Sequence, residues 1–441
     1  MSPKLWQSGS GKLDPVVERF LASDDIQWDQ RLVPYDILGN AVQARLLVKA
    51  KVLTKAEGAR LVKVLAVLYR TWEQGGLKLR LSDEDVHTRI EAELTKRLGD
   101  LGKKIHTGRS RNDQVLTDLH LYLQDRLADL AVSLEVLRRA CLAVARRHVS
   151  TAMPGYTHTQ RAMPSSVGLW MGAWSEAFGA DARLLSSLGQ WPCPLGSGSG
   201  YGTLVNPDRA YAASLLGMPS PGNVLAAQTS RGKAELEVLH TLAQALLDCN
   251  RLASDGLLFS TAEFGFVRLP VSMTTGSSLM PNKRNADVWE LIRAAYHLHL
   301  GDLTALASLQ GNLPSGYNRD LQPSKGLLMR SVERALEVLE VTRRTVEAME
   351  IDRKRCREAC DHAVLATDRA TLLALSGTPF RDAYRAVKAG ATGGGVSLEQ
   401  ALQGKRAIGA PGNLRLGRSR IRRPWVPSNL HLLDPRWRMG R

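Results

Sequence analysis

The sequence predicts an all-α protein, built on an elongated central helix bundle with smaller N- and C-terminal helical domains. Three observations lead to this expectation. No glycine or proline occurs between Asn112 and Pro154, apolar residues recur there at three- to four-residue spacing, and few segments alternate with period two. Aromatic residues make up only 5% of the chain, which disfavours a sheet protein.

The stretch after Asn112 predicts one very long helix. Its apolar positions fall on a single seam: Leu116, Leu119, Leu123, Leu127, Leu130, Leu134, Leu137, Cys141 and Val144. At 1.5 Å per residue, the helix would be on the order of 55 Å long. Since the mean globular helix has about three turns, this one needs equally long neighbours to cover its seam.

Three later segments continue the helical pattern and supply such neighbours: Lys233 to about Phe259, Ala286 to about Leu309 (with Gly301 interrupting the pattern), and Ser324 to Glu350. A bundle with this much leucine surface usually buries the remainder between subunits.

A chain of 441 residues is long enough for about three domains. We expect an N-terminal helical domain at residues 1–108, a central bundle and oligomerisation domain at 109–355, and a small C-terminal domain at 356–441. The last of these would end in a basic tail, 405–441.

Composition and patterning favour a soluble cytoplasmic protein. Hydrophobic residues at 44% and charged residues at 23% are ordinary for globular proteins. The N-terminus lacks the apolar core of a signal peptide, and no apolar run approaches the ~20 residues that span a bilayer. Five scattered cysteines fit a reducing compartment better than a disulfide framework.

Net charge is concentrated at the C-terminus. Between Lys405 and Arg441 there are ten Lys or Arg and one acid, Asp434, so this segment holds +9 of the total +16. Such an arm could bind nucleic acid or a membrane surface. We favour a solvated extension and expect no nucleic-acid partner.

Two other patterns raise ligand questions. Cys356, Cys360 and His362 lie close together, but no second ligand pair accompanies them, so we expect no metal. The glycine-rich segment LGSGSGYGT, residues 195–203, is not preceded by a strand pattern, which disfavours a dinucleotide loop. It fits a connection that passes close to a ligand or another chain.

Polar chemistry collects in four stretches, of which HTGRSRNDQ, residues 106–114, begins the long helix. Ser110 and Asp113 form a capping pattern, so Arg111 and Asn112 lie at the helix N-terminus. Free backbone N–H groups beside arginines suit a carboxylate. A capped helix with solvated arginines is the alternative.

The other three stretches are PGYTHTQRAMP (154–164), TTGSSLMPNKRN (274–285), which Glu290 follows, and LPSGYNRDLQPSK (313–325). The stretch PGYTHTQRAMP contains His158, which lies off any apolar stripe; a lone histidine is more often structural or exposed. Adjacent serines on a glycine suit a mobile loop.

Together these stretches resemble the fumarase/aspartase superfamily and, within it, the argininosuccinate lyase/δ-crystallin family. GSSLMPNKRN is similar to the superfamily signature GSSxMPxKxN, while HTGRSRNDQ, GYTHTQ and YNRDLQ are similar to the family's other blocks. The resemblance runs from about Leu5 to Asn413. It implies a three-domain, mainly α subunit that forms a homotetramer, with each active site built from three subunits.

The resemblance implies cleavage of argininosuccinate to arginine and fumarate, without metal or other cofactor. Ser277 matches the catalytic serine, His158 the catalytic histidine and Glu290 the carboxylate that orients it, while Lys283 would help to hold the carboxylate next to the reacting carbon. The matching substrate-contact positions are Ser23, Arg111, Asn112, Thr157, Asn285, Tyr317, Gln322 and Lys325.

Several positions depart from the family pattern. Ala286 replaces a proline after the signature, and Ala226 and Gly232 replace acids. The alternatives are a sibling lyase of the adenylosuccinate lyase or fumarase type, and a non-enzymatic δ-crystallin-like structural protein.

Overall fold

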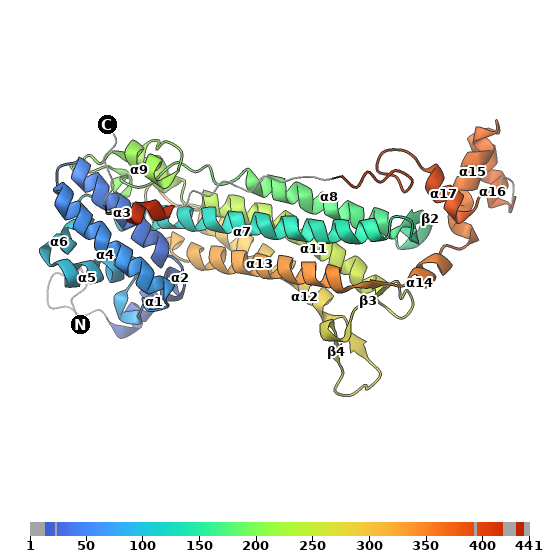
Figure 1. Cartoon of the computed structure of the whole chain (residues 1–441), viewed down its shortest axis with the longest axis horizontal. Coiled ribbons are helices and arrows are strands. Elements are labelled where there is room, and N and C mark those ends of the chain that lie inside the picture. The colour runs from blue at the N-terminus through green and yellow to red at the C-terminus, as the bar shows by residue number, and fades with distance from the viewer. Residues whose placement is uncertain (1–13, 23, 392–394, 418–428, 436–441) are drawn as a thin grey trace.

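The long axis of the molecule is set by five helices that lie side by side (Figure 1). The computed structural model describes residues 14–22, 24–391, 395–417 and 429–435. The bundle helices are α7 (Arg111–Arg147), α8 (Val167–Ser186), α11 (Lys233–Phe259), α12 (Asp287–Leu309) and α13 (Ser324–Ala348). The predicted all-α class is confirmed.

Helix α7 starts where the capping pattern predicts. The Ser110 hydroxyl accepts from the N–H of Asn112, and the Asp113 carboxylate accepts from the N–H of Ser110 at 3.0 Å. All nine positions of the predicted seam are buried, against α8 and α13 in particular. Since burying one leucine contributes about 1.5–3 kcal/mol, this seam is a major part of what holds the bundle together.

The N-terminal elements form a cap at one end of the bundle (Figure 1). They are α1 (Pro15–Ala22), α2 (Asp25–Asp29), α3 (Val33–Lys49), α4 (Lys55–Glu73), α5 (Val86–Leu98) and α6 (Asp100–Lys103). α3 lies in the middle of this cap, and nearly every one of its residues is buried. α9 (Arg209–Leu216) packs on α3, and α10 (Val224–Thr229) lies close to the start of α7.

The C-terminal elements lie at the opposite end (Figure 1). They are α14 (Arg353–Glu358), α15 (Ala366–Leu375), α16 (Phe380–Lys388) and α17 (Leu398–Gly404). The three-domain division is compatible with this arrangement and remains a prediction.

The strands form three antiparallel two-stranded ribbons: β1 (Ala152–Thr157) with β2 (Gln160–Ser166), β3 (Val267–Arg268) with β6 (Glu350–Ile351), and β4 (Thr275–Gly276) with β5 (Arg284–Asn285). The first and third expose a hairpin tip. Among the described residues, no helix is long and apolar enough to cross a membrane.

The basic tail is only partly the solvated extension that the sequence predicts. Leu416 lies against Gly172 of α8, and its carbonyl accepts from Arg146. The short helix η7 (Asn429–Leu433) then packs on α3 and α4, with Leu432 completely buried in the core. The expectation is wrong for this segment because Leu432 inserts into the hydrophobic core and Leu433 packs against it, although the surrounding sequence is rich in arginine. Trp425 and Trp437 lie outside the described residues.

Candidate functional site

The serine-rich stretch forms the β4–β5 hairpin, which stands off the side of the bundle (Figure 1). Its loop is largely exposed in the single chain. The Ser277 hydroxyl oxygen accepts from the backbone N–H groups of Leu279 and Met280, at 3.3 and 3.0 Å. Two converging amides favour negative charge on that oxygen.

The base of this hairpin is fixed to α12, which places the signature residues relative to Glu290. The Thr275 hydroxyl donates to the Asp287 carboxylate. Trp289 is completely buried against Gly256 of α11, where a Cβ would come within 2.6 Å of the indole. These contacts hold the helix start although Ala286, which replaces a proline, provides no side-chain cap. Glu290 is exposed one turn into the helix.

The histidine stretch forms the β1–β2 hairpin at the C-terminal end of α7. Thr157 pairs with Gln160, so His158 and Thr159 make a two-residue turn with φ angles of +52° and +58°. Positive φ at both central residues is the type I′ geometry that usually requires Asn-Gly. A β-branched residue there is strained, and such strain concentrates at functional sites. Both Thr157 and His158 are exposed.

The arginine-rich stretch lies at the opposite end of α7. Arg111 pairs with Asp85 at 2.9 Å. The side-chain amide of Asn112 donates to the Ser199 hydroxyl at 2.8 Å. Helix α7 is 37 residues long, so its two ends hold the Asn112 and His158 stretches far apart.

The fourth stretch lies at this same end, around the start of α13. The Lys325 ammonium is buried and contacts Asp29 at 2.6 Å and Asp25 at 3.1 Å. Although burial lowers the pKa of Lys325, these two carboxylates raise it above its usual value, so it stays charged. Gln322 donates to the carbonyl of Leu21 at 2.9 Å. The Arg231 guanidinium lies 4.5 Å above the ring of Tyr317.

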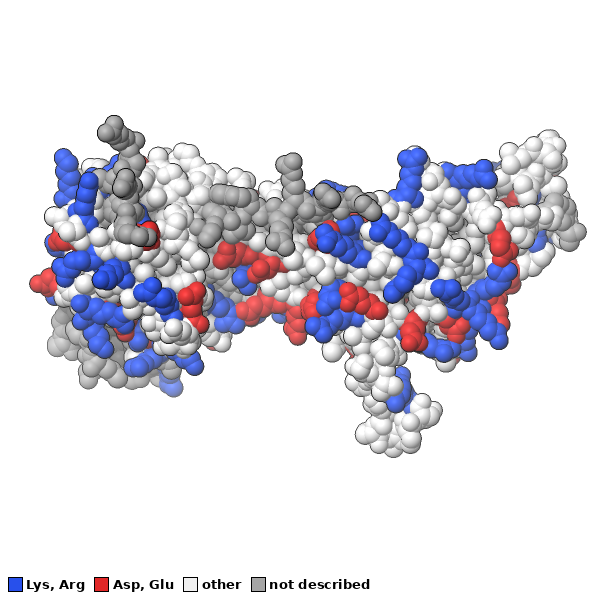
Figure 2. Space-filling model, in the orientation of Figure 1, with Lys and Arg blue, Asp and Glu red and all other residues white. Residues whose placement is uncertain are grey.

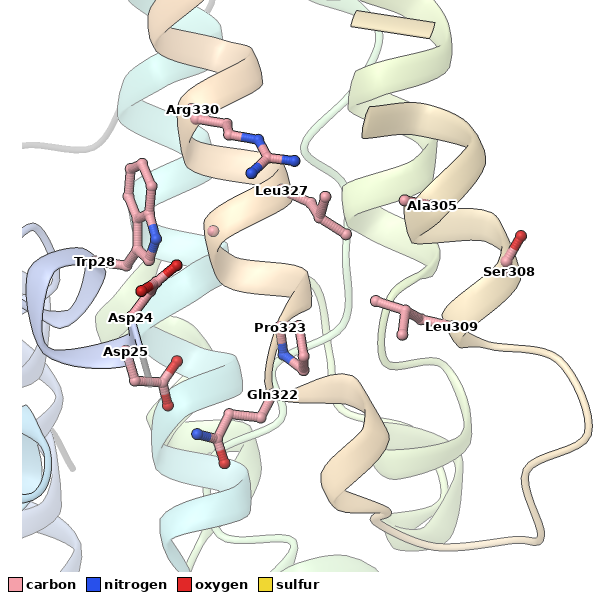
Figure 3. Close-up of a pocket in the computed structure, with 11 residues that line it drawn as sticks. Asp24, Asp25, Trp28, Ala305, Ser308, Leu309, Gln322, Pro323, Leu327 and Arg330 are labelled. Carbon is pink, nitrogen blue, oxygen red and sulfur yellow. The ribbon is translucent and has the colours of Figure 1, made fainter. Parts of the chain in front are cut away.

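One pocket opens beside Gln322, between α2, the end of α12 and the start of α13 (Figure 3). Its volume of about 470 Å³ is in the usual range for small-molecule sites. Asp24 and Asp25 lie on one side and Leu309 and Leu327 on another, and Arg330 also lines the pocket, so its lining combines both signs of charge with apolar side chains.

The structure therefore groups the predicted site residues in three places. Ser277, Lys283, Asn285 and Glu290 lie at the β4–β5 hairpin, His158 and Thr157 at the β1–β2 hairpin, and Arg111, Asn112, Tyr317, Gln322 and Lys325 at the N-terminal end of the bundle. One chain does not bring these groups together. Ser23 lies outside the described residues.

Sequence reasoning missed the acids that hold the basic candidates. Asp85 pairs with Arg111, and Asp25 and Asp29 pair with Lys325. Two acids four residues apart, here the first and last residues of α2, are too common a pattern to attract attention. The departure at Gly232 has a local reason: its φ is +87°, and a Cβ would come within 2.6 Å of Gln310.

Two groups of metal-ligand residue types lie outside these three places. Where the N-terminal cap meets α7, Asp36 of α3, His87 of α5 and Asp118 of α7 are buried together. Asp36 accepts from Nδ1 of His87, from Gln114 and from Asn40, and the whole cluster is a polar network beside the buried Arg109. Burial and the adjacent Asp36 raise the pKa of Asp118 well above its usual value.

The second group lies among the C-terminal elements. There the Cys360 thiol points to the carbonyl of Cys356, and His362 contacts Arg369. These side chains do not converge on one point.

Comparison with known proteins gives consistent results. A family model described as "Lyase" matches residues 10–297. The argininosuccinate lyase of Sorangium cellulosum is 45% identical over 423 residues, which cover 94% of this chain and 97% of that protein. The argininosuccinate lyase of Thermotoga neapolitana is 39% identical over 88% of this chain and 98% of its own length.

Solved structures agree on the fold. A crystal structure of EDDS lyase in complex with formate superposes with a TM-score of 0.75 at 22% identity, covering 92% of this chain and 88% of that one. The class II fumarase of Schistosoma mansoni gives a TM-score of 0.68 at 17% identity, covering 81% and 84%.

Proposed function

Because the chain belongs to the argininosuccinate lyase family, we propose that it cleaves argininosuccinate to L-arginine and fumarate. The observation that carries this proposal is the 45% identity to an argininosuccinate lyase along nearly the whole of both chains. The activity makes it a carbon–nitrogen lyase of arginine biosynthesis, whose substrate is a small molecule.

The reaction requires a proton to leave the carbon next to a carboxylate, while a guanidinium nitrogen leaves the neighbouring carbon. We assign proton abstraction to Ser277, because two backbone N–H groups already converge on its oxygen. Excluding water when the loop closes would strengthen these contacts. His158, oriented by Glu290, then donates a proton to the leaving nitrogen. The reverse assignment of acid and base is the alternative.

The carbanion is accessible only if its carboxylate, on becoming a dianion, is held by fixed donors. Lys283 and Asn285 on the same hairpin supply a cation and an amide for this purpose. Removing one such donor typically costs about 3 kcal/mol of transition-state stabilisation.

Substrate binding is assigned to the third group of residues together with Thr157. Arg111 and Lys325 are already paired with acids of the chain. Each would therefore bind a carboxylate of the substrate while it keeps its contact with the acid. In the pocket beside Gln322, the carboxylate of Asp24 is the group we assign to the guanidinium end of the substrate.

A homotetramer would complete the site by bringing the three groups of residues from different subunits together. The apolar face that such an assembly needs is present. Leu291 and Leu298, seven residues apart on α12, are 70% and 60% exposed, and Leu247 and Leu258 of α11 are partly exposed as well. We place the enzyme in the cytoplasm, since its five cysteines are all free thiols.

A nucleic-acid role has less support. On the face shown in Figure 2, the described basic side chains are interspersed with acids over the bundle and do not form a continuous basic groove.

The decisive experiment incubates the purified protein with argininosuccinate and follows fumarate by its absorbance. Adenylosuccinate and malate are tested in parallel. Turnover of argininosuccinate alone supports the proposal, turnover of another substrate identifies a sibling lyase, and no turnover of any points to a δ-crystallin-like structural protein.

A further inference from the structure

The glycine-serine segment 195–202 wraps around the start of α7. Oδ2 of Asp113 accepts from the backbone N–H groups of Gly196 and Gly198, at 2.9 and 3.3 Å. Backbone N–H groups of residues that alternate between left- and right-handed conformations form an anion-binding concavity, as Gly196, Ser197 and Gly198 do, and here a carboxylate of the chain itself fills it. Asp113 is completely buried, so these bonds fix the segment next to Asn112.

Within the segment, Ser199 makes the contact that reaches the substrate stretch. Its hydroxyl lies 2.8 Å from the side-chain amide nitrogen of Asn112. That bond fixes the plane of the amide and therefore the direction in which its remaining donor and acceptor point.

The backbone of Ser199 carries a conformational cost. Its φ is +61°, between Gly198 at +56° and Gly200 at +96°. Left-handed conformation costs a non-glycine residue about 1–2 kcal/mol, and glycine would avoid that cost. A serine between two glycines is accounted for if its hydroxyl is used.

The far side of the segment faces another predicted substrate stretch. Gly200 packs on Gln228 of α10, where a Cβ would come within 3.1 Å of that side chain. Gly316 is the residue before Tyr317, and a Cβ built on it would lie 3.3 Å from the Tyr201 hydroxyl oxygen. The segment thus lies between Asn112 and the Gly316–Tyr317 turn.

We propose that Ser199 is a positioning residue, whose hydroxyl holds the Asn112 amide in the orientation that binds a carboxylate of the substrate. This inference rests on the proposed function and on the assignment of Asn112 to substrate binding. Ser199 acts through Asn112 and does not touch the reacting atoms.

Two substitutions separate the hydroxyl from the backbone strain. Ser199→Ala removes the hydroxyl and keeps the strain, whereas Ser199→Gly removes both. We expect each variant to raise KM for argininosuccinate about five- to tenfold with kcat within twofold. The melting temperature of Ser199→Gly should not fall. Ser214→Ala is the control: Ser214 is an exposed serine on α9 whose hydroxyl donates to the carbonyl of Tyr211 in its own helix, and the substitution should leave KM unchanged.

A double-mutant cycle tests the coupling. If Ser199 acts through Asn112, then adding Ser199→Gly to Asn112→Ala should change KM less than twofold. Equal effects of Ser199→Gly with and without Asn112 would overturn the proposal. A wild-type KM in Ser199→Gly would also overturn the proposal. If Ser199→Ala were impaired at the same time, the hydroxyl would serve to hold the strained backbone and not to orient Asn112. A wild-type protein inactive on argininosuccinate would refute the proposed function and this inference together, whereas an active wild type beside an unaffected Ser199→Gly refutes the inference alone.

Discussion

The ammonium of Lys325, on α13, lies 2.6 Å from a carboxylate oxygen of Asp29, on α2, and both side chains are buried. Asp25 completes the cluster, and the second oxygen of Asp29 accepts from the N–H of Val86. This cluster is one of the contacts that join the N-terminal cap to the bundle, and it lies at the predicted substrate site.

We predict that Lys325→Met destabilises the protein by about 3–5 kcal/mol, because it leaves two carboxylates buried without a cation. Asp29→Asn should cost less, since Lys325 keeps Asp25. Urea unfolding measures both. Lys103→Met, which breaks an exposed pair with Asp100, serves as the control and should be near wild type. A Lys325→Met protein as stable as this control would contradict the prediction.

The catalytic hairpin gives a second prediction. Ser277→Ala should lower kcat at least a hundredfold and leave KM within a few fold, because the hydroxyl acts mainly in the transition state. Steady-state kinetics of fumarate release measure this. Ser278→Ala is a matched control on the same loop and should retain most activity. Near-normal turnover in Ser277→Ala would remove this residue from the mechanism.

The separation of the site residues gives a third prediction. Inactive His158→Asn and inactive Ser277→Ala proteins, unfolded and refolded together, should recover part of the wild-type activity, because some mixed sites contain both native residues. Each variant refolded alone is the control. Mixed tetramers without activity would mean that His158 and Ser277 act in a site of a single chain, or that the subunits assemble differently.

The bundle apart from α8 could be delimited from the sequence, whereas α8, which packs along α7, and the cap could not. The apolar seam predicts α7, and the predicted Lys233–Phe259 segment matches α11. Helix α3 could not be delimited by the same means, because it is buried on all sides. It has no polar face, and its buried Asp36, Asn40 and Arg45 interrupt any apolar stripe.

The motifs predict which residues belong to the site, an assignment that stays a prediction, but they do not predict the geometry of the site. The type I′ turn is made by His158 and Thr159 in place of Asn-Gly, so the sequence carries no signal for a hairpin there. The bond between Asn112 and Ser199 joins positions 87 residues apart, which no local pattern reveals.

A pH effect follows from two acids that face each other between α8 and α11. Burial, together with repulsion from Asp248, raises the pKa of Asp181 to about 7. The folded protein therefore binds this proton more tightly than the unfolded chain. The resulting stability is fully present below about pH 4 and is lost as pH rises through about 7.

Accordingly, the wild type should lose on the order of 1–3 kcal/mol more than Asp181→Asn between pH 5 and pH 8. Thermal unfolding of both proteins at the two pH values gives this difference. Asp129→Asn, at a half-exposed position on α7, should keep the wild-type dependence. Identical pH dependence in Asp181→Asn and the wild type would exclude Asp181 as the titrating group.

The last prediction concerns the tail, where the structure changes the expectation. Leu432 is completely buried on α3 and α4, while Leu430, two residues earlier, is 52% exposed. Arg45 of α3 also donates to the carbonyl of Asp434. Leu432→Ala should therefore cost about 2–5 kcal/mol, as for other buried leucines, and Leu430→Ala almost nothing.

A chain that ends at Ser428 should be destabilised at least as much as Leu432→Ala, whereas one that ends at Pro435 should be close to wild type. Because η7 lies on the cap and far from both hairpins, the folded fraction of each variant should keep kcat within a few fold. Urea unfolding of the four proteins decides the matter: equal stability of Leu432→Ala and Leu430→Ala would show that η7 does not anchor the tail.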